Sequence, residues 1–568
     1  MTGRGAAYRH RPEAFVHRRG EDAVAADLAR ARGPLTGLRL AVKNNVDVAG
    51  FPTTAGCPAF ASDPAGQDAT AVRRLVAQGA VVVGTTNLDQ FATGLVGQRS
   101  PYGGVRDVRR ETHVSGGSSS GSAVAVASGA ADLAIGTDTA GSGRVPAAYQ
   151  GIVGIKPTLG VVSTDGVVPA CRSWDAVTIM ARDLDTADAA MGVMAGGDGT
   201  RPWPADVPLA APEKARVAVP AELPAMAPGW AGAFRAAEAR LRAAGCDVAA
   251  VDFTPFLAAA RLLYDGALVA ERHAAVGEFV DEHPGDVDPT VAAIVSAAGR
   301  VSGSDYVRDV ARLQQLRDAC AAVLGGYDAL LVPTAPFQPT IAEVADEPVG
   351  VNSRVGTYTN FCNLFDLCAV AVPSGTVDEG EAGVAQFGVT VLAPAFHDAV
   401  ALDLARRVTV PSVSVAVEEA APPLPRPTVP WPVAAGVSCV ELFVVGAHLR
   451  GQPLEPELRA LGARWAGAAR TAPHYRLGAL DTTPPKPGLA RVAADGASVA
   501  GELWQLSHGA LGRFLAALPA PMNLGRVELA DGQWVVGFGC AADALDGAED
   551  ITRFGSWRAY LDARAATV

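Results

Sequence analysis

HVSGGSSSGSAVAVASG, residues His113 to Gly129, has a centre made only of glycine and serine, GGSSSG. That composition fits a flexible linker, a loop around a phosphate or a catalytic loop. The flanks argue against a linker, because VVVGTTN before it and SAVAVASGAADLAIG after it are apolar and structured. No GKS, GKT or GxGxxG pattern supports a phosphate site. A tight structural turn and a catalytic loop both remain open.

Helix-like and strand-like segments alternate on both sides of this stretch. Residues 68–80, DATAVRRLVAQGA, place apolar side chains on one helical face, with Asp68 as a candidate N-cap. The strand-like segments AVVVGTTN and DLAIGTD lie on either side of a small-residue helix in GSAVAVASGA. This order predicts an α/β fold with loops gathered at strand ends, where substrate sites usually form.

The composition is that of a globular protein. Of the 568 residues, 49% are hydrophobic and 19% are charged, which excludes disorder for most of the length. The formal net charge of -12 provides no chain-wide basic surface, so we expect neither nucleic acid nor a membrane as a partner. No apolar window reaches the roughly 18 residues of a membrane span. The first 20 residues lack the apolar core of a secretory signal.

The eight cysteines are scattered and form no CxxC pair. This pattern argues against zinc sites, redox motifs and a dense disulfide framework. We therefore expect reduced thiols in a cytoplasmic protein, with no metal and no cofactor.

A proline-rich segment, EEAAPPLPRPTVPWP at residues 418–432, marks the largest shift in composition. Proline fixes φ and removes a backbone donor, so this segment is typical of a semi-rigid, extended linker. We predict a first domain over residues 1–420, a linker over 421–433 and a second domain over 434–568.

Lys43 ends the strand-like segment LRLAVK, in which Leu38, Leu40 and Val42 lie on one face. Desolvation by such neighbours lowers the pKa of a lysine and allows the neutral amine to act as a base. The alternative is a lysine that reaches solvent or forms a salt bridge.

Ser142 follows the second strand-like segment, in IGTDTAGSGRVPAA. A serine between glycines after a strand can project into a cleft, with backbone N–H groups aimed at a developing oxyanion. It is not a GxSxG nucleophile elbow, because Ala140 stands where that motif requires glycine. Histidine is sparse in this region, so a nucleophilic Ser142 needs another kind of base.

Together, Lys43, Ser118 in GGSS and Ser142 in GTDTAGSGR resemble the amidase signature family in residue type, order and spacing. The resemblance covers residues 20–410 and implies a mixed central sheet flanked by helices. It implies that neutral Lys43 accepts a proton from Ser118, and Ser118 one from Ser142. Ser142 would then attack an amide carbonyl and form an acyl-enzyme.

The same resemblance implies a cis peptide bond between Gly117 and Ser118. It also implies an oxyanion hole built from the backbone of the nucleophile loop. The candidate donors are the N–H groups of Thr139, Ala140, Gly141 and Ser142.

Three longer stretches resemble the allophanate hydrolases within that family. They are GTDTAGSGRVPAAYQGIVGIKPT, LLYDGALVAERHAAV and NSRVGTYTNFCNLFDLCAVAVP. The resemblance implies that Tyr264 and Arg272 anchor a small anionic substrate, and arginine can hold a carboxylate through two parallel hydrogen bonds. Without the family, these two residues, on one expected helix, are a packed aromatic and a surface ion pair.

The tail resembles the C-terminal domain of allophanate hydrolases, which is similar in fold to γ-glutamyl cyclotransferases. VVGAHLRGQPL, PKPGLARV, GELW and DITRFGSWRAYL carry this likeness. It implies a small α+β domain that assists decarboxylation of N-carboxycarbamate after the first domain has released ammonia. The candidate residues are His448, Lys486 and Glu502, although a histidine at a strand end can also be purely structural.

The resemblance therefore implies that a homodimer hydrolyses allophanate to ammonia and carbon dioxide. A separate urea carboxylase is a candidate partner, because no biotin-carboxylase or biotin-attachment region is found in this sequence. One alternative is a general small-amide amidase or the amidase component of a tRNA-dependent amidotransferase, which the acidic charge and the tail disfavour. Another is a binding or scaffold protein, which would have no need of Lys43, Ser118 and Ser142 together.

Overall fold

The computed structural model describes residues 11–411 and 421–566, and these form two compact units. The second unit combines the segment Trp203–Glu213 with the residues from Gly436 onward, and the rest belongs to the first unit. The predicted end of the first domain, at residue 420, lies outside the described residues. Residues 1–10, half of the stretch in which we expect no secretory signal, also lie outside them. Within the described residues, no helix is long and apolar enough to cross a membrane. None of the eight cysteines is paired.

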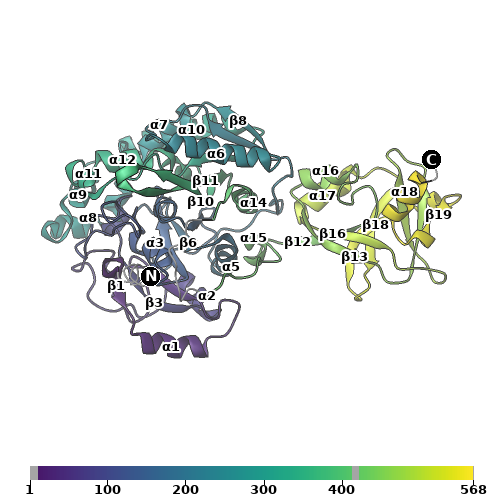
Figure 1. The fold of residues 1–568 in the computed structure, drawn as a ribbon, viewed down its shortest axis with the longest axis horizontal. Helices are drawn as coiled ribbons and strands as arrows, with labels where there is room; N and C mark the ends of the chain where they lie inside the picture. The colour runs from purple at the N-terminus through teal and green to yellow at the C-terminus, as the bar shows by residue number, and fades with distance from the viewer. Residues whose placement is uncertain (1–10, 412–420, 567–568) are drawn as a thin grey trace. The chain divides into compact units, whose positions relative to one another are not determined.

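A mixed 11-stranded sheet forms the centre of the first unit, in the order β1-β3-β2-β4-β6-β5-β10-β11-β9-β7-β8 (Figure 1). Strands β3, β4 and β6 are buried at every residue, so both faces of the sheet are covered there. The predicted α/β fold with a mixed sheet is confirmed. The strands are β1 (Phe15–Arg18), β2 (Arg39–Lys43), β3 (Val81–Thr86), β4 (Leu133–Asp138), β5 (Val153–Lys156), β6 (Ala176–Ala181), β7 (Arg216–Pro220), β8 (Asp247–Val251), β9 (Ala329–Pro333), β10 (Cys368–Asp378) and β11 (Val384–Ala393).

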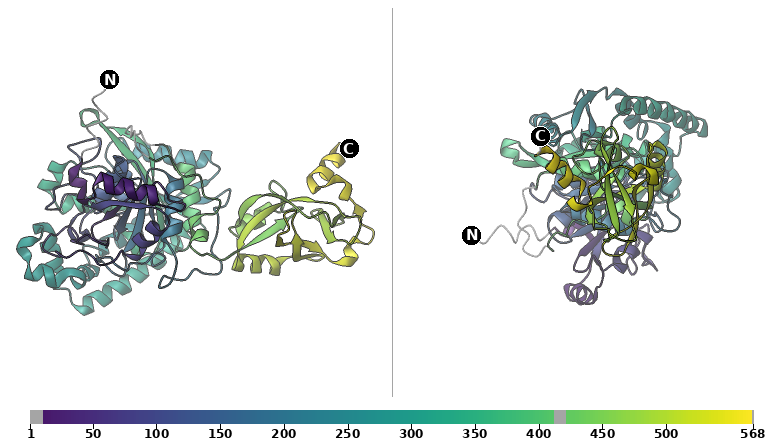
Figure 2. Two further views of the ribbon diagram at one scale, coloured as in Figure 1. Left: turned by 90° about the horizontal axis from the view of Figure 1, so that it is seen from below. Right: turned by 90° about the vertical axis from the view of Figure 1, so that its right-hand side faces the viewer.

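Helices surround this sheet (Figure 2). Helix α3 packs with α4, α5 packs with α2 and α15, and α14 packs with α6. Each of these three sets contains helices that contact the sheet. The helices are α1 (Glu21–Arg30), α2 (Thr70–Ala77), α3 (Ser120–Ala127), α4 (Val145–Gln150), α5 (Leu184–Met194), α6 (Trp230–Ala243), α7 (Thr254–Leu262), α8 (Ala270–Glu282), α9 (Pro289–Ala298), α10 (Gly303–Leu324), α11 (Ile341–Asp346), α12 (Gly350–Val355), α13 (Phe361–Leu364), α14 (Asp398–Val408) and α15 (Trp431–Ala434).

The elements predicted around GGSSSG are confirmed as β3, α3 and β4. The predicted cap on α2 is wrong. Asp68 does not cap this helix, because its carboxylate accepts the backbone N–H of Ala49 at 2.8 Å. The N-cap position falls on Ala69 and has no side-chain hydrogen bond.

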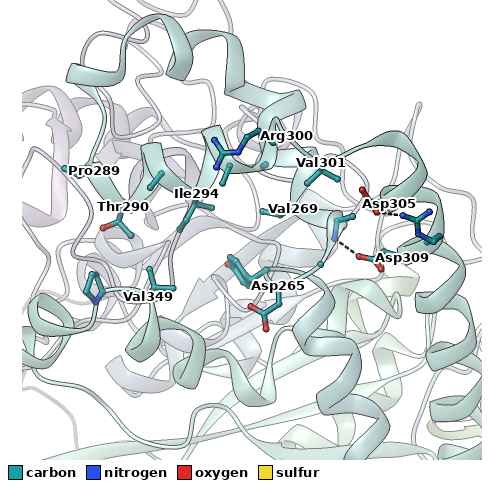
Figure 3. Close-up of a pocket in the computed structure, with 18 residues that line it drawn as sticks. Asp265, Val269, Pro289, Thr290, Ile294, Arg300, Val301, Asp305, Asp309 and Val349 are labelled. Atoms are coloured by element: carbon teal, nitrogen blue, oxygen red, sulfur yellow. Dashed lines mark hydrogen bonds and ion pairs between the residues drawn. The ribbon is translucent and has the colours of Figure 1, made fainter.

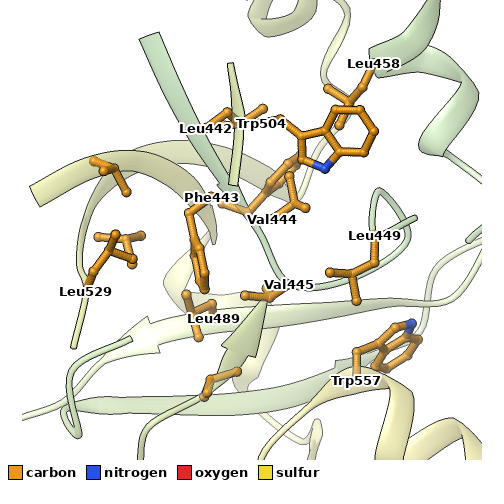
Figure 4. Close-up of a cluster of buried hydrophobic side chains, with 14 of the residues drawn as sticks. Leu442, Phe443, Val444, Val445, Leu449, Leu458, Leu489, Trp504, Leu529 and Trp557 are labelled. Carbon is orange, nitrogen blue, oxygen red and sulfur yellow. The ribbon is translucent and has the colours of Figure 1, made fainter. Parts of the chain in front are cut away.

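The second unit contains a five-stranded sheet, β13-β16-β12-β18-β17, and a three-stranded sheet, β15-β14-β19. Buried side chains from several of these elements form its core, among them Phe443, Leu458 and Trp504 (Figure 4). The elements are β12 (Cys439–Val444), α16 (Glu455–Ala460), β13 (Arg464–Arg470), β14 (Tyr475–Leu480), β15 (Lys486–Arg491), β16 (Ala500–Ser507), α17 (His508–Ala517), β17 (Met522–Glu528), β18 (Trp534–Cys540), β19 (Glu549–Asp550) and α18 (Trp557–Ala565).

The segment Trp203–Glu213 falls inside the predicted first domain but packs within the second unit. The N–H of Leu209 donates to the carbonyl of Gly462 at 2.8 Å. The N–H of Gly509 donates to the carbonyl of Ala205 at 2.6 Å. The second unit therefore includes a strap from far earlier in the chain, which no composition signal in the sequence predicts.

Gly462→Ala tests whether this strap contributes to stability. Gly462 has φ +69°, and an added Cβ would lie 2.6 Å from Cβ of Pro208 on the strap. Gly451 is the matched control, because its φ is +75° and nothing lies within 4 Å of its added Cβ. We expect urea unfolding of the full chain to show a loss for Gly462→Ala about 1–3 kcal/mol larger than for Gly451→Ala. Equal losses would contradict this packing.

Candidate active site

Lys43 lies at the end of β2, beside β3 and β4, and is 0% exposed. Its Nζ lies 2.8 Å from Oγ of Ser118 and 2.7 Å from Oγ1 of Thr137, the residue before the last of β4. Its burial excludes a lysine that reaches solvent, and among the described residues no carboxylate lies within salt-bridge distance of its Nζ. The structure thus brings together two of the three residues predicted from the sequence.

The GGSSSG loop lies between the strand ends and the start of α4. Ser119 fastens it to β4, because its Oγ donates to the carbonyl of Thr137 at 3.1 Å. Gly116 has φ +79°, and an added Cβ would lie 2.8 Å from Cα of Pro146 in α4. The Gly117–Ser118 peptide bond is cis, as the family resemblance implies. The two glycines therefore allow the close approach that places Ser118 against Lys43.

Ser142 lies in the turn between β4 and α4 and is 3% exposed. A buried ion pair holds this turn: Nε and Nη2 of Arg144 each donate to the Asp138 carboxylate at 2.9 Å. The same carboxylate accepts the N–H groups of Gly141 at 2.9 Å and Gly143 at 3.0 Å. Within the described chain, the Ser142 hydroxyl has no hydrogen-bond partner, so the structure does not join Ser142 to Ser118.

The candidate oxyanion donors separate into two groups. Gly141 already donates its N–H to Asp138, so this group would have to leave a carboxylate in order to bind an oxyanion. The N–H groups of Thr139, Ala140 and Ser142 donate to no other described residue. The hydroxyl of Thr139 donates to Asp175, which fixes the side chain of this residue.

Burial lowers the pKa of Lys43 to about 7, against the opposing attraction of Asp89, Asp175 and Asp138. Arg272 adds to the lowering, which indicates that its charge lies near the lysine. A lysine with a pKa near 7 is half neutral at neutral pH. It is therefore matched to the work of a general base.

Arg272 and Tyr264 contact each other, but they do not lie on one helix. Tyr264 lies in a turn after α7, and Arg272 lies near the start of α8. Nη2 of Arg272 donates to the Tyr264 hydroxyl at 3.2 Å, and Nη1 donates to Oγ1 of Thr93 at 2.9 Å. Arg272 is 1% exposed, so the alternative of a surface ion pair is wrong.

Tyr264 also borders an open hollow of about 950 Å³ (Figure 3). Ile294 of α9, Val301 and Val349 contribute apolar side chains to its walls, and Arg300 and Asp305 contribute charged ones. Lys43, Ser118 and Ser142 are not among its lining residues. The hollow therefore reaches Tyr264 but does not contain the three catalytic candidates.

In the second unit, His448 follows β12 and is buried between two aromatic rings. It stacks on Phe538 with centroids 5.0 Å apart and meets the edge of Phe514 at 5.2 Å. Its Nε2 lies 2.9 Å from Oε2 of Glu457. Burial lowers the pKa of His448, although Glu457 opposes this, and the charge of Lys486 lowers it further.

The other two candidates of the second unit differ in their surroundings. Lys486 is buried at the start of β15, and its Nζ has no ion-pair or hydrogen-bond partner among the described residues. Glu502 of β16 accepts the N–H of Arg450 at 2.9 Å and pairs with Arg558 at 3.0 Å. The charge of Lys486 thus acts on His448, whereas Glu502 contacts Arg450 and Arg558.

Several residues that build these sites were not predicted from the sequence. In the first unit they are Thr93, Thr137, Asp138, Arg144 and Asp175. In the second unit they are Glu457, Phe514 and Phe538. Only Asp138 and Arg144 carry a signal in the sequence, since they lie on either side of the AGSG turn. Among the described residues, no cluster of His, Cys, Asp or Glu could hold a metal ion.

The amidase family model matches residues 10–402. The chain belongs to the amidase family. The model of the allophanate hydrolase C-terminal domain matches residues 440–562 of this amidase.

Individual relatives cover this amidase to different extents. The urea amidolyase of Lachancea kluyveri is 41% identical over 553 residues, which is 93% of this chain and 30% of that protein. The chain therefore spans about a third of the length of the curated relatives that it first matches. The structure of Kluyveromyces lactis allophanate hydrolase is 37% identical, with a TM-score of 0.87 over 99% of this chain and 97% of that one. A glutamyl-tRNA(Gln) amidotransferase component of Treponema pallidum is 34% identical over 66% of this chain and 81% of its own length.

The pH dependence of kcat/KM tests the role of Lys43. If Lys43 is the general base, only its neutral amine is active, so kcat/KM should rise with pH through a midpoint near 7. Asp89→Asn removes the largest attraction that favours the protonated lysine, so the midpoint should move to lower pH. Asp198→Asn, at an exposed carboxylate, should leave the midpoint unchanged. A profile with the same midpoint in all three proteins would exclude Lys43 as the base.

Proposed function

We propose that this amidase hydrolyses allophanate, urea-1-carboxylate, and that Ser142, Ser118 and Lys43 carry out the first step. The observation that carries this proposal is the state of Arg272. Its guanidinium is buried near Lys43, and no carboxylate lies within ion-pair distance of it among the described residues. Its Nε has no hydrogen-bond partner there either.

A buried, unpaired charge is costly, and proteins normally pair it or give it a function. Arg272 has five N–H donors, and only two contacts, with Thr93 and Tyr264, are made by side chains. Both of these partners are neutral. A substrate carboxylate would supply the missing countercharge, and allophanate carries one at the end opposite its amide.

The chemistry follows from the positions of the three side chains. Neutral Nζ of Lys43 takes the proton of Ser118, and Ser118 takes the proton of Ser142 as the Ser142 oxygen attacks the amide carbonyl. The carbon–nitrogen bond then breaks, and ammonia leaves with the proton returned through Ser118. Water hydrolyses the acyl-enzyme and releases N-carboxycarbamate. The open N–H groups of Thr139, Ala140 and Ser142 would stabilise the negative oxygen.

The comparisons support allophanate over the alternative amides. The amidotransferase relative aligns with 66% of this chain, whereas the allophanate hydrolase structure aligns with 99%. The match to the allophanate hydrolase C-terminal domain adds independent support. A non-enzymatic scaffold is disfavoured by the lowered pKa of Lys43, because a binding protein has no use for a buried base.

We also propose that the protein acts in the cytoplasm as a homodimer. A urea carboxylase would supply its substrate, and the relatives named urea amidolyase support this link to urea.

Ammonia release tests the proposed substrate when allophanate, acetamide, malonamide and glutamine are offered separately. We expect the highest kcat/KM with allophanate. Ser142→Ala should lower this value by at least about 10³-fold and keep the fold, because it removes the nucleophile. Ser62→Ala, at an exposed serine, is the matched control and should remain fully active. A preference for glutamine would contradict the substrate, and an active Ser142→Ala variant would contradict the mechanism.

For the second unit, we propose that His448 and Lys486 assist decarboxylation of N-carboxycarbamate. Lys486 is a buried cation without a countercharge among the described residues, which suits an anion with two carboxylates. Loss of carbon dioxide breaks a carbon–nitrogen bond and leaves its electron pair on nitrogen, which must take up a proton. The protonated imidazolium of His448, which the contact of Nε2 with Glu457 favours, would deliver that proton. Glu502 remains a candidate that orients Arg450 and Arg558.

His448→Ala should slow this second step and leave the first unchanged. With ¹³C-labelled allophanate, NMR should show N-carboxycarbamate persisting longer with the variant than with the wild type. His474→Ala, at an exposed histidine of the same unit, is the matched control and should behave as the wild type. Equal lifetimes for the intermediate with all three proteins would contradict a role for His448.

A further inference from the structure

Thr93 holds the guanidinium of Arg272 without neutralising its charge. Its Oγ1 accepts Nη1 of Arg272 at 2.9 Å and lies 3.3 Å from the carbonyl of Phe91, to which it donates. The hydroxyl hydrogen is thus directed to Phe91, and a lone pair is left for Arg272. Because threonine is uncharged, the positive charge of Arg272 remains available to an anion.

The backbone around Thr93 is fixed in an uncommon conformation. Phe91 and Ala92 have φ values of +49° and +53°, a region that residues with side chains rarely adopt. Hydrogen bonds secure this turn, since the N–H of Phe91 donates to the carbonyl of Ala55 at 2.8 Å and that of Ala92 to Asp89 at 2.9 Å. Thr93 is therefore presented by a rigid turn and not by a free loop.

The same turn is packed against the helix that carries Arg272. Phe91 belongs to a buried cluster with Val276 and Val280, and its ring lies 6.0 Å from that of Phe279. Arg272, Val276 and Val280 are spaced four residues apart on α8, so they share one face of this helix. The packing of Phe91 therefore sets the position of the turn along α8 and brings Thr93 level with Arg272.

We propose that Thr93 is a positioning residue that makes the site selective for amides bearing a carboxylate. It does so by fixing the direction in which Arg272 presents its remaining donors. This inference rests on the proposed function, because it assumes that Arg272 binds the substrate carboxylate. Tyr264 holds Nη2, the other terminal nitrogen of the guanidinium, so loss of Thr93 would leave Arg272 buried but free to turn.

Allophanate and biuret form a matched pair of substrates, because biuret has a neutral amide where allophanate has its carboxylate. Thr93→Val keeps the shape of the side chain and removes the acceptor. It should raise KM for allophanate about tenfold with kcat within about twofold, since a hydrogen bond to a charged group is worth roughly 1.4 kcal/mol or more. Its kcat/KM for biuret should stay within about twofold of wild type. Thr93→Ser restores the hydroxyl and should return KM for allophanate to the wild-type value.

Three results would overturn the inference. They are an unchanged KM of Thr93→Val for allophanate, an equal loss with both substrates, and failure of Thr93→Ser to restore KM. If Thr93→Val does not fold, Thr93→Ala, which adds no bulk, takes its place with the same expected values. If the wild type itself does not prefer allophanate to biuret, the proposed function fails and this inference with it. If that preference is present and survives in Thr93→Val, the role of Thr93 alone fails.

Discussion

The contact of Lys43 with Ser118 is the interaction on which the rest of the site depends. A lysine can be held neutral only where water is excluded, so β2 and β4 must end in the interior and the loop above them must close tightly. Two glycines make that closure possible, because a side chain at Gly116 would collide with α4. The burial that lowers the pKa of Lys43 to about 7 and the glycine-rich loop are therefore two parts of one requirement.

Two buried arginines near this centre differ in how their charge is balanced. The charge of Arg144 is balanced by Asp138, and the pair holds the turn that carries Ser142. Arg272 is equally buried but contacts only neutral oxygens. Burial alone does not separate the two arginines, and the difference between them is the carboxylate partner, which supports the proposed binding role of Arg272.

The α/β fold and the elements around GGSSSG could be predicted from the sequence, because apolar periodicity and strand ends are local signals. Lys43, Ser118 and Ser142 could be found because the family resemblance relates distant residues. Thr93 and Thr137 could not, since a single threonine has no pattern and gains its role only from strand pairing and the turn at Phe91.

The strap at residues 203–213 could not be predicted for the same reason. Its packing partners lie more than 200 residues away, and its composition resembles that of any loop. The motif also places Gly141 among the candidate oxyanion donors. The sequence does not reveal that the N–H of Gly141 already donates to Asp138.

The charges around Lys43 also couple binding to basicity. Arg272 lowers the pKa of Lys43, while Asp89, Asp175 and Asp138 raise it. A carboxylate bound to Arg272 would offset the repulsion between the two cations, so the amine would become a stronger base when the anion is in place. A neutral amide in the same position would leave that repulsion intact. A bound anion would therefore make Lys43 a stronger base and at the same time raise the pH at which its amine becomes neutral, so the pH midpoint for the bound state should lie above that of the free protein.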